Sequence, residues 1–335
     1  MSADAHTTYQ QIVQVARNHV QAGLDLSDSL MLQVAEQAPG QLSTRMVQLS
    51  SRKGKRIRSI LLFLLAETGL APHDPLRAAR AAASVEMLHL ASLVHDDVID
   101  ESLERRGVRT AHSEWGNKVA VLVGDYILSK SMEFVVDEAD RRIPACLAGA
   151  ASSLIAGEIM EIDYAGRRDL TVEQYFQVIH GKTASLVDAC ARCGAMLAGH
   201  SPELVDSCGR LGTHFGLAFQ IIDDLLDYGV GAKDLGKAKF SDLGNGLVTL
   251  PLLFYFQDCT PEERQQIDSL LGQTSQPGVV AQIVALLQQK GSFEKAKETA
   301  MEHLADAAQI LSRLPETPAR QLLVSFFASM AERSN

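Results

Sequence analysis

SLVHDDVIDES, residues 92–102, is the stretch that decides the fold. It follows the apolar run Met87–Val94 and places four titratable side chains within six positions, namely His95, Asp96, Asp97 and Asp100. The apolar run predicts a buried helix, on which carboxylates four positions apart lie on one face. Like charges at that spacing repel, so the arrangement needs a compensating cation.

A second stretch, QIIDDLLDYG at residues 220–229, repeats the pattern. In both, a pair of aspartates is followed by two apolar residues and a third aspartate. We therefore expect two helices that present matching carboxylate sets. The predicted metal ligands are Asp96, Asp97, Asp100, Asp223, Asp224 and Asp227.

Carboxylates with room for water suit hard cations, and Mg²⁺ in particular is held by a few carboxylates together with substrate phosphates. The two sets therefore predict a magnesium-dependent diphosphate site.

Ordinary solvated helix faces would explain one acidic cluster, but they explain two matching clusters on apolar helices poorly. A carboxylate-bridged di-iron bundle needs two Glu-x-x-His pairs, and the sequence supplies one, Glu86 and His89.

The whole chain, residues 1–335, predicts a single all-α domain. Hydrophobic residues make up 46% of it and recur three and four positions apart, and no stretch alternates as a strand would. Gly, Pro and polar residues predict breaks at 71–75, 105–110, 143–144, 166–171, 199–202, 229–246 and 315–318. The net charge of −10 argues against nucleic acid as a partner, so an anionic ligand must be bound by local groups.

Targeting and redox signals are weak in this sequence. The N-terminal MSADAHTTYQ has no apolar signal core, and Ile60–Ala66 is too short to span a bilayer. We expect a cytoplasmic protein with no transmembrane segment.

Cys190 and Cys193 form a C-x-x-C that would suit redox chemistry or zinc, but a second pair is lacking and residues 183–199 predict a continuous buried helix.

Basic residues complete the candidate site. SRKGKRIRS, residues 51–59, gathers five cations directly before an apolar helix start, which is a good position for binding an anion. The patch is short and lacks aromatic residues, so nucleic-acid binding is a weaker interpretation. Further cations follow the aspartate sets: Arg105 and Arg106 after the first, and Lys233, Lys237 and Lys239 after the second. Two diphosphate sites would use all of these groups.

The chain resembles the trans-isoprenyl diphosphate synthases, which are the polyprenyl synthetase family of head-to-tail prenyltransferases. The matching stretches are GKRIR at 54–58, HLASLVHDDVID at 89–100, RRG at 105–107, GNKVAVLVGDY at 116–126, GKTASL at 181–186, QIIDDLLD at 220–227, LGK at 235–237 and TLP at 249–251. Their order and spacing make the resemblance specific.

The resemblance implies an isoprenoid-synthase-type helical bundle around a central cavity, usually as a homodimer, with Mg²⁺ as cofactor in three positions. It implies isopentenyl diphosphate and an allylic diphosphate as substrates. The isopentenyl diphosphate pocket would be formed by Lys55, Arg58, His89 and Arg106. The residues at the allylic diphosphate would be Arg105, Lys182 and Lys237. Thr183 and Gln220, beside Lys182, match catalytic groups near the developing carbocation.

Two small residues, Ala91 and Ser92, precede the first aspartates. In family members that make farnesyl or geranylgeranyl diphosphate, bulky aromatic residues at these places commonly block the growing tail. We therefore expect a product longer than C20, with Leu88 and Met132 at a deeper floor; the alternative is a shorter-chain synthase. A water-insoluble product implies transient contact with a membrane for its release.

Three residues depart from the family pattern. Ser59 stands where proline is usual, Glu161 where glutamine is frequent, and Leu247 where many members have a lysine that reaches the diphosphate. The missing lysine keeps open a non-catalytic subunit that regulates another prenyl synthase, although such subunits typically lack the aspartate sets. A class I terpene cyclase shares the bundle and the first motif, but it has no use for a second diphosphate pocket.

Overall fold

The computed structural model describes residues 3–51, 54–105, 107–230 and 240–332. Arg106 and Lys237, two of the predicted substrate ligands, lie outside the described residues, as do Lys233 and Lys239. The described chain is helical apart from one antiparallel pair of short strands, β1 (Glu104–Arg105) and β2 (Val108–Arg109). The prediction of an all-α fold is therefore confirmed.

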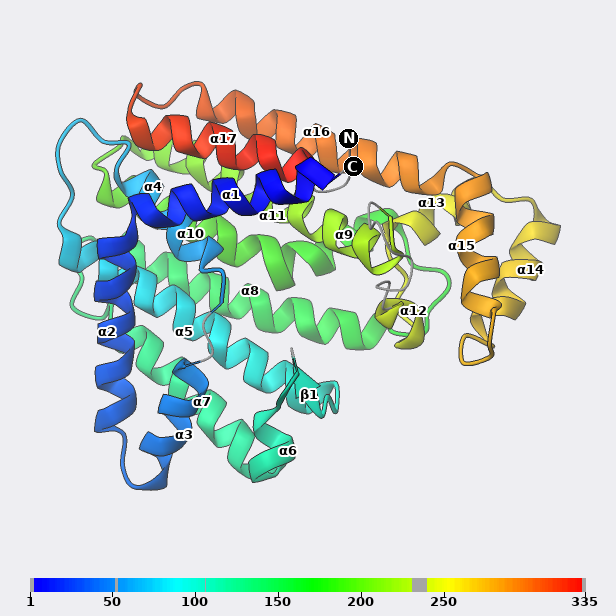
Figure 1. Ribbon diagram of the computed structural model, residues 1–335, viewed down its shortest axis with the longest axis horizontal. Coiled ribbons are helices and arrows are strands. Elements are labelled where there is room, and N and C mark those ends of the chain that lie inside the picture. Colours follow the sequence, from blue (N-terminus) through cyan, green and yellow to red (C-terminus); the bar gives the residue numbers. More distant parts are fainter. Residues whose placement is uncertain (1–2, 52–53, 106, 231–239, 333–335) are drawn as a thin grey trace.

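Figure 1 shows the helices in their order along the chain. Their bounds are α1 Ala3–His19, α2 Gln21–Gln37, α3 Gln41–Ser50, α4 Ile57–Ala66, α5 Pro75–Ile99, α6 Ala111–Trp115, α7 Asn117–Glu133, α8 Arg142–Tyr164, α9 Val172–Ile179, η1 His180–Ala184, α10 Ser185–Leu197, α11 Pro202–Asp227, α12 Ser241–Gly244, α13 Leu250–Asp258, α14 Pro261–Leu271, α15 Val279–Gln289, α16 Ser292–Leu311 and α17 Pro318–Glu332.

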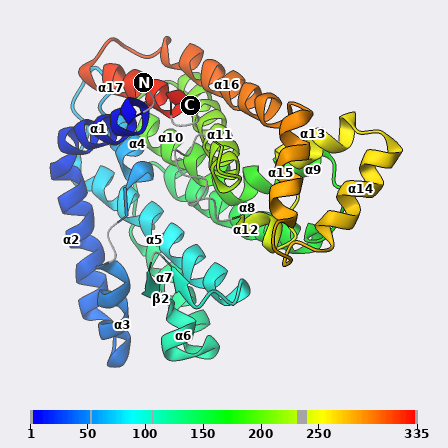
Figure 2. The same ribbon diagram turned by 45° about the vertical axis from the view of Figure 1, so that its right-hand side comes forward.

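The long helices pack around one another to form the bundle. The closest pairings join α11 to α10 and α16, and α5 to α7. In both views α1 lies beside α17, while α14 and α15 lie at the opposite end of the molecule from α2 and α3 (Figures 1 and 2). The site described below forms where the C-terminal ends of α5 and α11 meet α8, α9 and η1.

Two long helices carry the acidic stretches, and each begins at a defined cap. Asp74 accepts hydrogen bonds from the backbone N–H groups of Leu76 and Arg77 at the start of α5, and Ser201 caps α11 in the same way. A proline follows each cap, where its missing N–H costs nothing. Both helices end at their aspartates, where the negative end of the helix dipole adds to the charge of the carboxylates.

Two details differ from the prediction. The expected break at 143–144 lies earlier, since α8 begins at Arg142 and Pro144 sits in its first turn, which tolerates proline. The helix that contains the C-x-x-C is preceded by a single π-helical turn, η1, which periodicity alone does not predict.

Cys190 and Cys193 are fully buried in α10, and burial raises the pKa of Cys190, so both are core thiols.

Candidate active site

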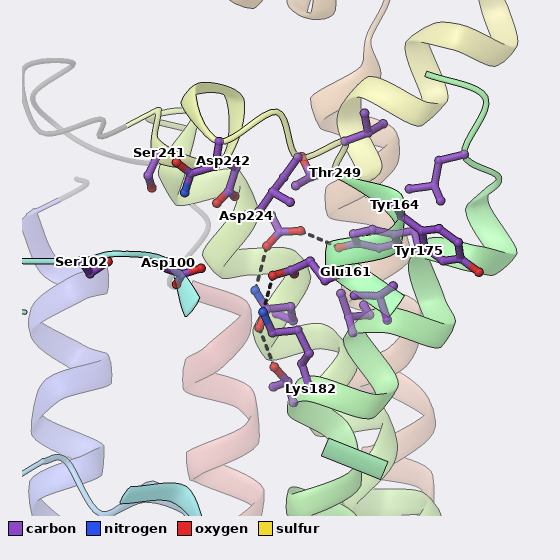
Figure 3. A pocket seen from close by; sticks show the side chains of 18 of the residues that line it. Asp100, Ser102, Glu161, Tyr164, Tyr175, Lys182, Asp224, Ser241, Asp242 and Thr249 are labelled. Atoms are coloured by element: carbon purple, nitrogen blue, oxygen red, sulfur yellow. Dashed lines mark hydrogen bonds and ion pairs between the residues drawn. The ribbon is translucent and has the colours of Figure 1, made fainter. Parts of the chain in front are cut away.

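The first aspartate set lies at the C-terminal end of α5. The buried carboxylate of Asp97 accepts a hydrogen bond from Nε of Arg105 at 2.7 Å, which ties α5 to β1. Asp97 and Asp100 line a cavity of about 620 Å³, and Figure 3 shows Asp100 on the side opposite Glu161 and Asp224. Asp96 lies on the wall of a neighbouring cavity of about 290 Å³. The set therefore reaches two cavities.

The environment of this set opposes negative charge. Burial, followed by the charge of Glu158, raises the pKa of Asp96 to about 7. Burial also raises the pKa of Asp100. Such shifts are typical of carboxylates that lack sufficient cationic partners. A divalent cation bound here would reverse them, because it favours the ionised form.

The three aspartates of the second set lie in different surroundings. Asp224 is buried and accepts hydrogen bonds from the hydroxyl of Tyr175 at 2.6 Å and from Nε2 of Gln220 at 2.9 Å. Burial and the nearby Asp242 raise its pKa to about 8, although both hydrogen bonds act in the opposite direction. Asp227 accepts from the backbone N–H groups of Ser241 and Asp242 and so holds the start of α12. These contacts fix two of the three carboxylates.

Lys182 sits between the acidic groups of α8. Its ammonium lies 2.9 Å from a carboxylate oxygen of Glu158. It also pairs with Glu161, and Figure 3 shows this second contact. Burial opposes the charge of Lys182, but the two glutamates outweigh burial and raise its pKa. The predicted catalytic lysine is therefore charged and held at the cavity wall.

A close crossing of α8 and η1 places this lysine. A Cβ atom on Gly157 would lie 2.6 Å from the backbone nitrogen of Lys182, so only glycine allows the two segments to approach this far. The π-helical turn then presents Lys182 and Thr183 in succession, and both line the 620 Å³ cavity. Single π-turns are frequent at functional sites.

The predicted isopentenyl diphosphate residues come together in another cavity, of about 270 Å³. Lys55, Arg58, His89 and Asp223 line it. Arg56, from the same basic stretch, also lines this cavity, and its guanidinium is paired with Asp28 at 2.7 Å and with Glu86 at 2.9 Å. Glu86 also accepts a hydrogen bond from Ser59, which occupies the usual proline position. Arg56 therefore borders the cavity with its charge already paired to two carboxylates.

Thr183 is shared by two of these cavities. It lines the 270 Å³ cavity with Lys55 and His89, and the 620 Å³ cavity with Asp100 and Lys182. Its hydroxyl donates to Oε1 of Gln220 at 2.7 Å. Thr183 therefore lies where the contents of the two cavities would meet.

The third cavity, on whose wall Asp96 lies, is mostly apolar. It is lined by Leu88, Ala91, Ser92 and Leu128 on one side and by residues of α8 such as Leu154 on the other. The predicted wall residues Ala91, Ser92 and Leu88 are therefore in place. Met132 is not among its lining residues; Leu128, one turn earlier on α7, takes that position.

Several lining residues were not predicted as site residues. Tyr175, Glu158 and Asp242 all contact predicted ones, and burial raises the pKa of Asp242 to about 7. The run GEIME at 157–161 carried a signal for Glu158, since its glycine and two glutamates recur at helical spacing. Tyr175 lies 49 positions from Asp224 and carried no such signal.

The donor set fits a hard divalent cation. It consists of carboxylates that have too few cationic partners to balance their charge. Carboxylate oxygens suit Mg²⁺ better than they suit softer metals. Within the described ranges, no three Asp, Glu, His or Cys side chains are arranged closely enough to form a metal cage by themselves.

The fold and these cavities define a class: a helical bundle in which an acidic and a basic cavity lie beside an apolar one. A family model described as Polyprenyl synthetase matches residues 40–287. The octaprenyl diphosphate synthase of Escherichia coli (strain K12) is 35% identical over 271 residues, which cover 81% of this chain and 83% of that protein. An all-trans-nonaprenyl-diphosphate synthase (geranyl-diphosphate specific) of Rhodobacter capsulatus is 39% identical over 278 residues, with the same coverage of 81% and 83%.

Two solved structures extend the comparison. A decaprenyl diphosphate synthase from Rhodobacter capsulatus matches with a TM-score of 0.91 at 29% identity, covering 96% of this chain and 99% of that one. A polyprenyl synthase from Caulobacter crescentus CB15, complexed with calcium and isoprenyl diphosphate, matches with a TM-score of 0.85 at 28% identity, covering 96% and 98%. The chain belongs to the polyprenyl synthetase family, and it is a prenyltransferase.

Proposed function

We propose that this enzyme condenses isopentenyl diphosphate with an allylic diphosphate, such as farnesyl or geranylgeranyl diphosphate, to give a trans-polyprenyl diphosphate longer than C20. The observation that carries the proposal is the meeting of three cavities at the aspartate sets. One is acidic, one is basic and one is apolar. They suit a metal-bound diphosphate, a second diphosphate held by cations, and a hydrocarbon tail.

Mg²⁺ is the proposed cofactor, in three positions between the aspartate sets and the allylic diphosphate. Asp96, Asp100, Asp223 and Asp227 are its proposed ligands. Bound there, Mg²⁺ would act as a Lewis acid that neutralises the departing diphosphate. Asp97 would serve through its ion pair with Arg105, which holds that cation at the cavity wall.

The cationic side chains divide between the two diphosphates. Lys182 and Arg105 line the acidic cavity and would bind the allylic diphosphate, together with Lys237. Lys55, Arg58 and His89 line the basic cavity and would hold isopentenyl diphosphate, together with Arg106. Fixed cations stabilise a leaving diphosphate more than water does, because they need no reorganisation as charge develops.

Thr183 and Gln220 are proposed to stabilise the allylic carbocation. Thr183 borders both proposed substrate cavities, so its hydroxyl oxygen would lie between the leaving group and the attacking double bond. Oxygen lone pairs at this point would stabilise the positive charge electrostatically. The proton lost after bond formation would pass to the departing diphosphate, so the side chains need supply no general base.

The apolar cavity is the proposed path of the tail. Ala91 and Ser92 are too small to close it next to Asp96, so the growing chain would pass them. Leu88 and Leu128 lie deeper on the same wall. Because no bulky residue closes the cavity at this point, we expect a product of about 30 to 50 carbons.

A homodimer is proposed, with its interface on α7 and α8. Among the described residues α8 is the helix long and apolar enough to cross a membrane, yet only 28% of its most apolar window is buried. Ile155 and Ile159 on α8 are exposed, as is Leu122 on α7. Because α8 also carries Glu158 and Glu161 of the site, it belongs to the bundle and is not a membrane span. We therefore assign its exposed apolar face to a second copy of the chain. Leu122→Asp should give a monomer by light scattering, whereas Leu70→Asp, at a more exposed leucine outside this face, should leave the dimer intact.

The product itself tests the proposed function. Purified protein is incubated with farnesyl diphosphate, radiolabelled isopentenyl diphosphate and Mg²⁺, and the product is dephosphorylated and separated by chain length. We expect labelled alcohols longer than C20. Labelled products that stop at C15 or C20 would assign the chain to the shorter synthases instead.

The proposed localisation, cytoplasmic with transient membrane contact, predicts that phospholipid vesicles speed release of the product.

A further inference from the structure

A chain of hydrogen bonds links a buried tyrosine to the proposed carbocation site. The hydroxyl of Tyr175 donates to Oδ2 of Asp224 at 2.6 Å, and Nε2 of Gln220 donates to Oδ1 of the same carboxylate at 2.9 Å. Thr183 donates to Oε1 of Gln220 at 2.7 Å. Figure 3 shows Tyr175 directed at Asp224 from α9, on the far side of Asp224 from the cavity mouth at Asp100.

The direction of each bond follows from the groups that make it. Both oxygens of Asp224 accept, one from Tyr175 and one from Nε2 of Gln220, so Gln220 turns its carbonyl oxygen toward Thr183. A hydroxyl has one proton, and Thr183 commits it to that carbonyl oxygen. The remaining lone pairs of Thr183 are then available to the two cavities that this residue borders.

The surroundings of Asp224 favour this role over metal binding. Asp224 is 4% exposed, and each of its oxygens already accepts a hydrogen bond from the chain. Tyr175 is likewise 4% exposed and comes from a different helix, so it anchors the carboxylate from behind. An aspartate held from two sides can fix the orientation of Gln220, which it meets one turn earlier on α11.

We propose that Tyr175 is a positioning residue: acting through Asp224 and Gln220, it fixes the hydroxyl of Thr183 so that oxygen lone pairs face the allylic carbocation. This rests on the proposed function. Because the interaction develops in the transition state, its loss lowers kcat and leaves the KM for both diphosphates near the wild-type values. Removal of one oriented group of this kind typically costs at least about tenfold in rate.

The first test is Tyr175→Phe, which keeps the ring and removes the hydroxyl. We expect kcat for condensation to fall at least about tenfold while both KM values stay within about twofold. Tyr255→Phe is the matched control, since Tyr255 is also buried but its hydroxyl lies outside the site. The Tyr255→Phe protein should keep the wild-type kcat. Equal kcat values for the two variants would overturn the proposal.

A double-mutant cycle then asks whether Tyr175 acts through Thr183. Thr183→Val removes the end of the chain, whereas Thr183→Ser keeps the hydroxyl and should restore most of the rate. In the Thr183→Val background, Tyr175→Phe should lower kcat by less than about twofold, because the hydrogen-bond chain no longer ends in a hydroxyl. The same fold loss in both backgrounds would contradict the proposal.

Two further arms separate this role from others. If Tyr175→Phe instead raises the Mg²⁺ concentration for half-maximal rate and leaves kcat unchanged, Asp224 acts on the metal and the proposal is wrong. If the Tyr175→Phe protein does not fold, Asp224→Asn enters the same cycle, since an amide there must turn its N–H toward Gln220 and reverse that side chain. A wild-type protein that does not condense would overturn the proposed function; a condensing wild type with an unresponsive cycle would overturn this proposal alone.

Discussion

Gly157 of α8 and Gly181 of η1 cross with their backbones in contact. A Cβ atom on Gly181 would lie 2.7 Å from Cα of Gly157, a separation that real side chains do not show. The crossing brings the backbone of η1 against α8, so that Lys182 reaches both Glu158 and Glu161. The position of the predicted catalytic lysine therefore depends on two residues that have no side chains of their own.

Gly157→Ala tests this dependence. The added methyl group would force η1 away from α8 and displace Lys182 and Thr183, so we expect kcat to fall by at least about tenfold. Gly149→Ala is the matched control, because Gly149 lies on the same helix and a Cβ there meets nothing within 4 Å. It should keep wild-type activity and gain slightly in thermal stability from its higher helix propensity. Similar kinetics for the two variants would show that the close crossing is not required.

Leu247→Lys tests what is lost where this chain has leucine and many family members have lysine. Leu247 lines that cavity with Asp100, Glu161 and Asp242, and the lining cations Arg105 and Lys182 are each paired with carboxylates. An added ammonium should lower the KM for the allylic diphosphate by about tenfold, the worth of one charge-assisted hydrogen bond. The KM for isopentenyl diphosphate should not change. Leu247→Met, which adds no charge, should match the wild type; a Lys variant that also matches it would place Leu247 out of reach of the diphosphate.

The raised pKa values predict how stability depends on pH without metal. Burial raises the pKa of Asp96 and of Asp242 to about 7. Between about pH 4 and pH 7 the folded protein therefore binds protons that the unfolded chain has released, so the free energy of unfolding falls as pH rises. Urea unfolding in EDTA should show lower stability at pH 8 than at pH 6.

Mg²⁺ should reverse this trend, because it binds the ionised carboxylates. We expect added Mg²⁺ to stabilise the protein more at pH 8 than at pH 6. Asp96→Asn serves as the control and should lose part of the pH dependence in EDTA. Equal stabilisation by Mg²⁺ at both pH values would mean that these carboxylates do not bind it.

Ala91→Tyr tests the path of the tail. Ala91 is buried on α5 beside the apolar cavity, so a phenol ring there should fill the cavity and end elongation early. Chromatography of the dephosphorylated product should then show chains no longer than C20, with incorporation of the first isopentenyl unit still occurring. Leu76→Tyr, at an exposed position of the same helix, should leave the product length unchanged. An Ala91→Tyr enzyme that is active and keeps the wild-type length would show that the tail runs elsewhere.

Much of the fold could be predicted from the sequence because the chain is helical and its caps are explicit. Asp74 and Ser201, each followed by a proline, begin α5 and α11 as capping rules predict. The π-helical turn was not predictable, since the same residues have ordinary helical periodicity. It depends on the tertiary contact between Gly157 and Gly181.

The candidate site was predictable where the chemistry lies within one helix. The spacing of the first set predicted clustered carboxylates, although Asp100 lines the 620 Å³ cavity and Asp96 lines the apolar one. The small residues Ala91 and Ser92 line that apolar cavity, as predicted. Contacts between helices were not predictable: the ion pairs of Lys182 with α8, and the hydrogen bond between Tyr175 and Asp224, join residues distant in sequence. The ion pair between Arg56 and Glu86 likewise joins two helices, and the sequence pattern did not predict it.

The most direct test of the central claim measures two products of one reaction. Wild-type protein receives farnesyl diphosphate and radiolabelled isopentenyl diphosphate, and released diphosphate and labelled lipid are counted together, with Mg²⁺ and with EDTA. The account predicts one diphosphate for each labelled unit incorporated, and neither product in EDTA. Diphosphate release without incorporated label would indicate a cyclase, and the absence of both products with Mg²⁺ present would indicate a non-catalytic subunit; either result would contradict the account.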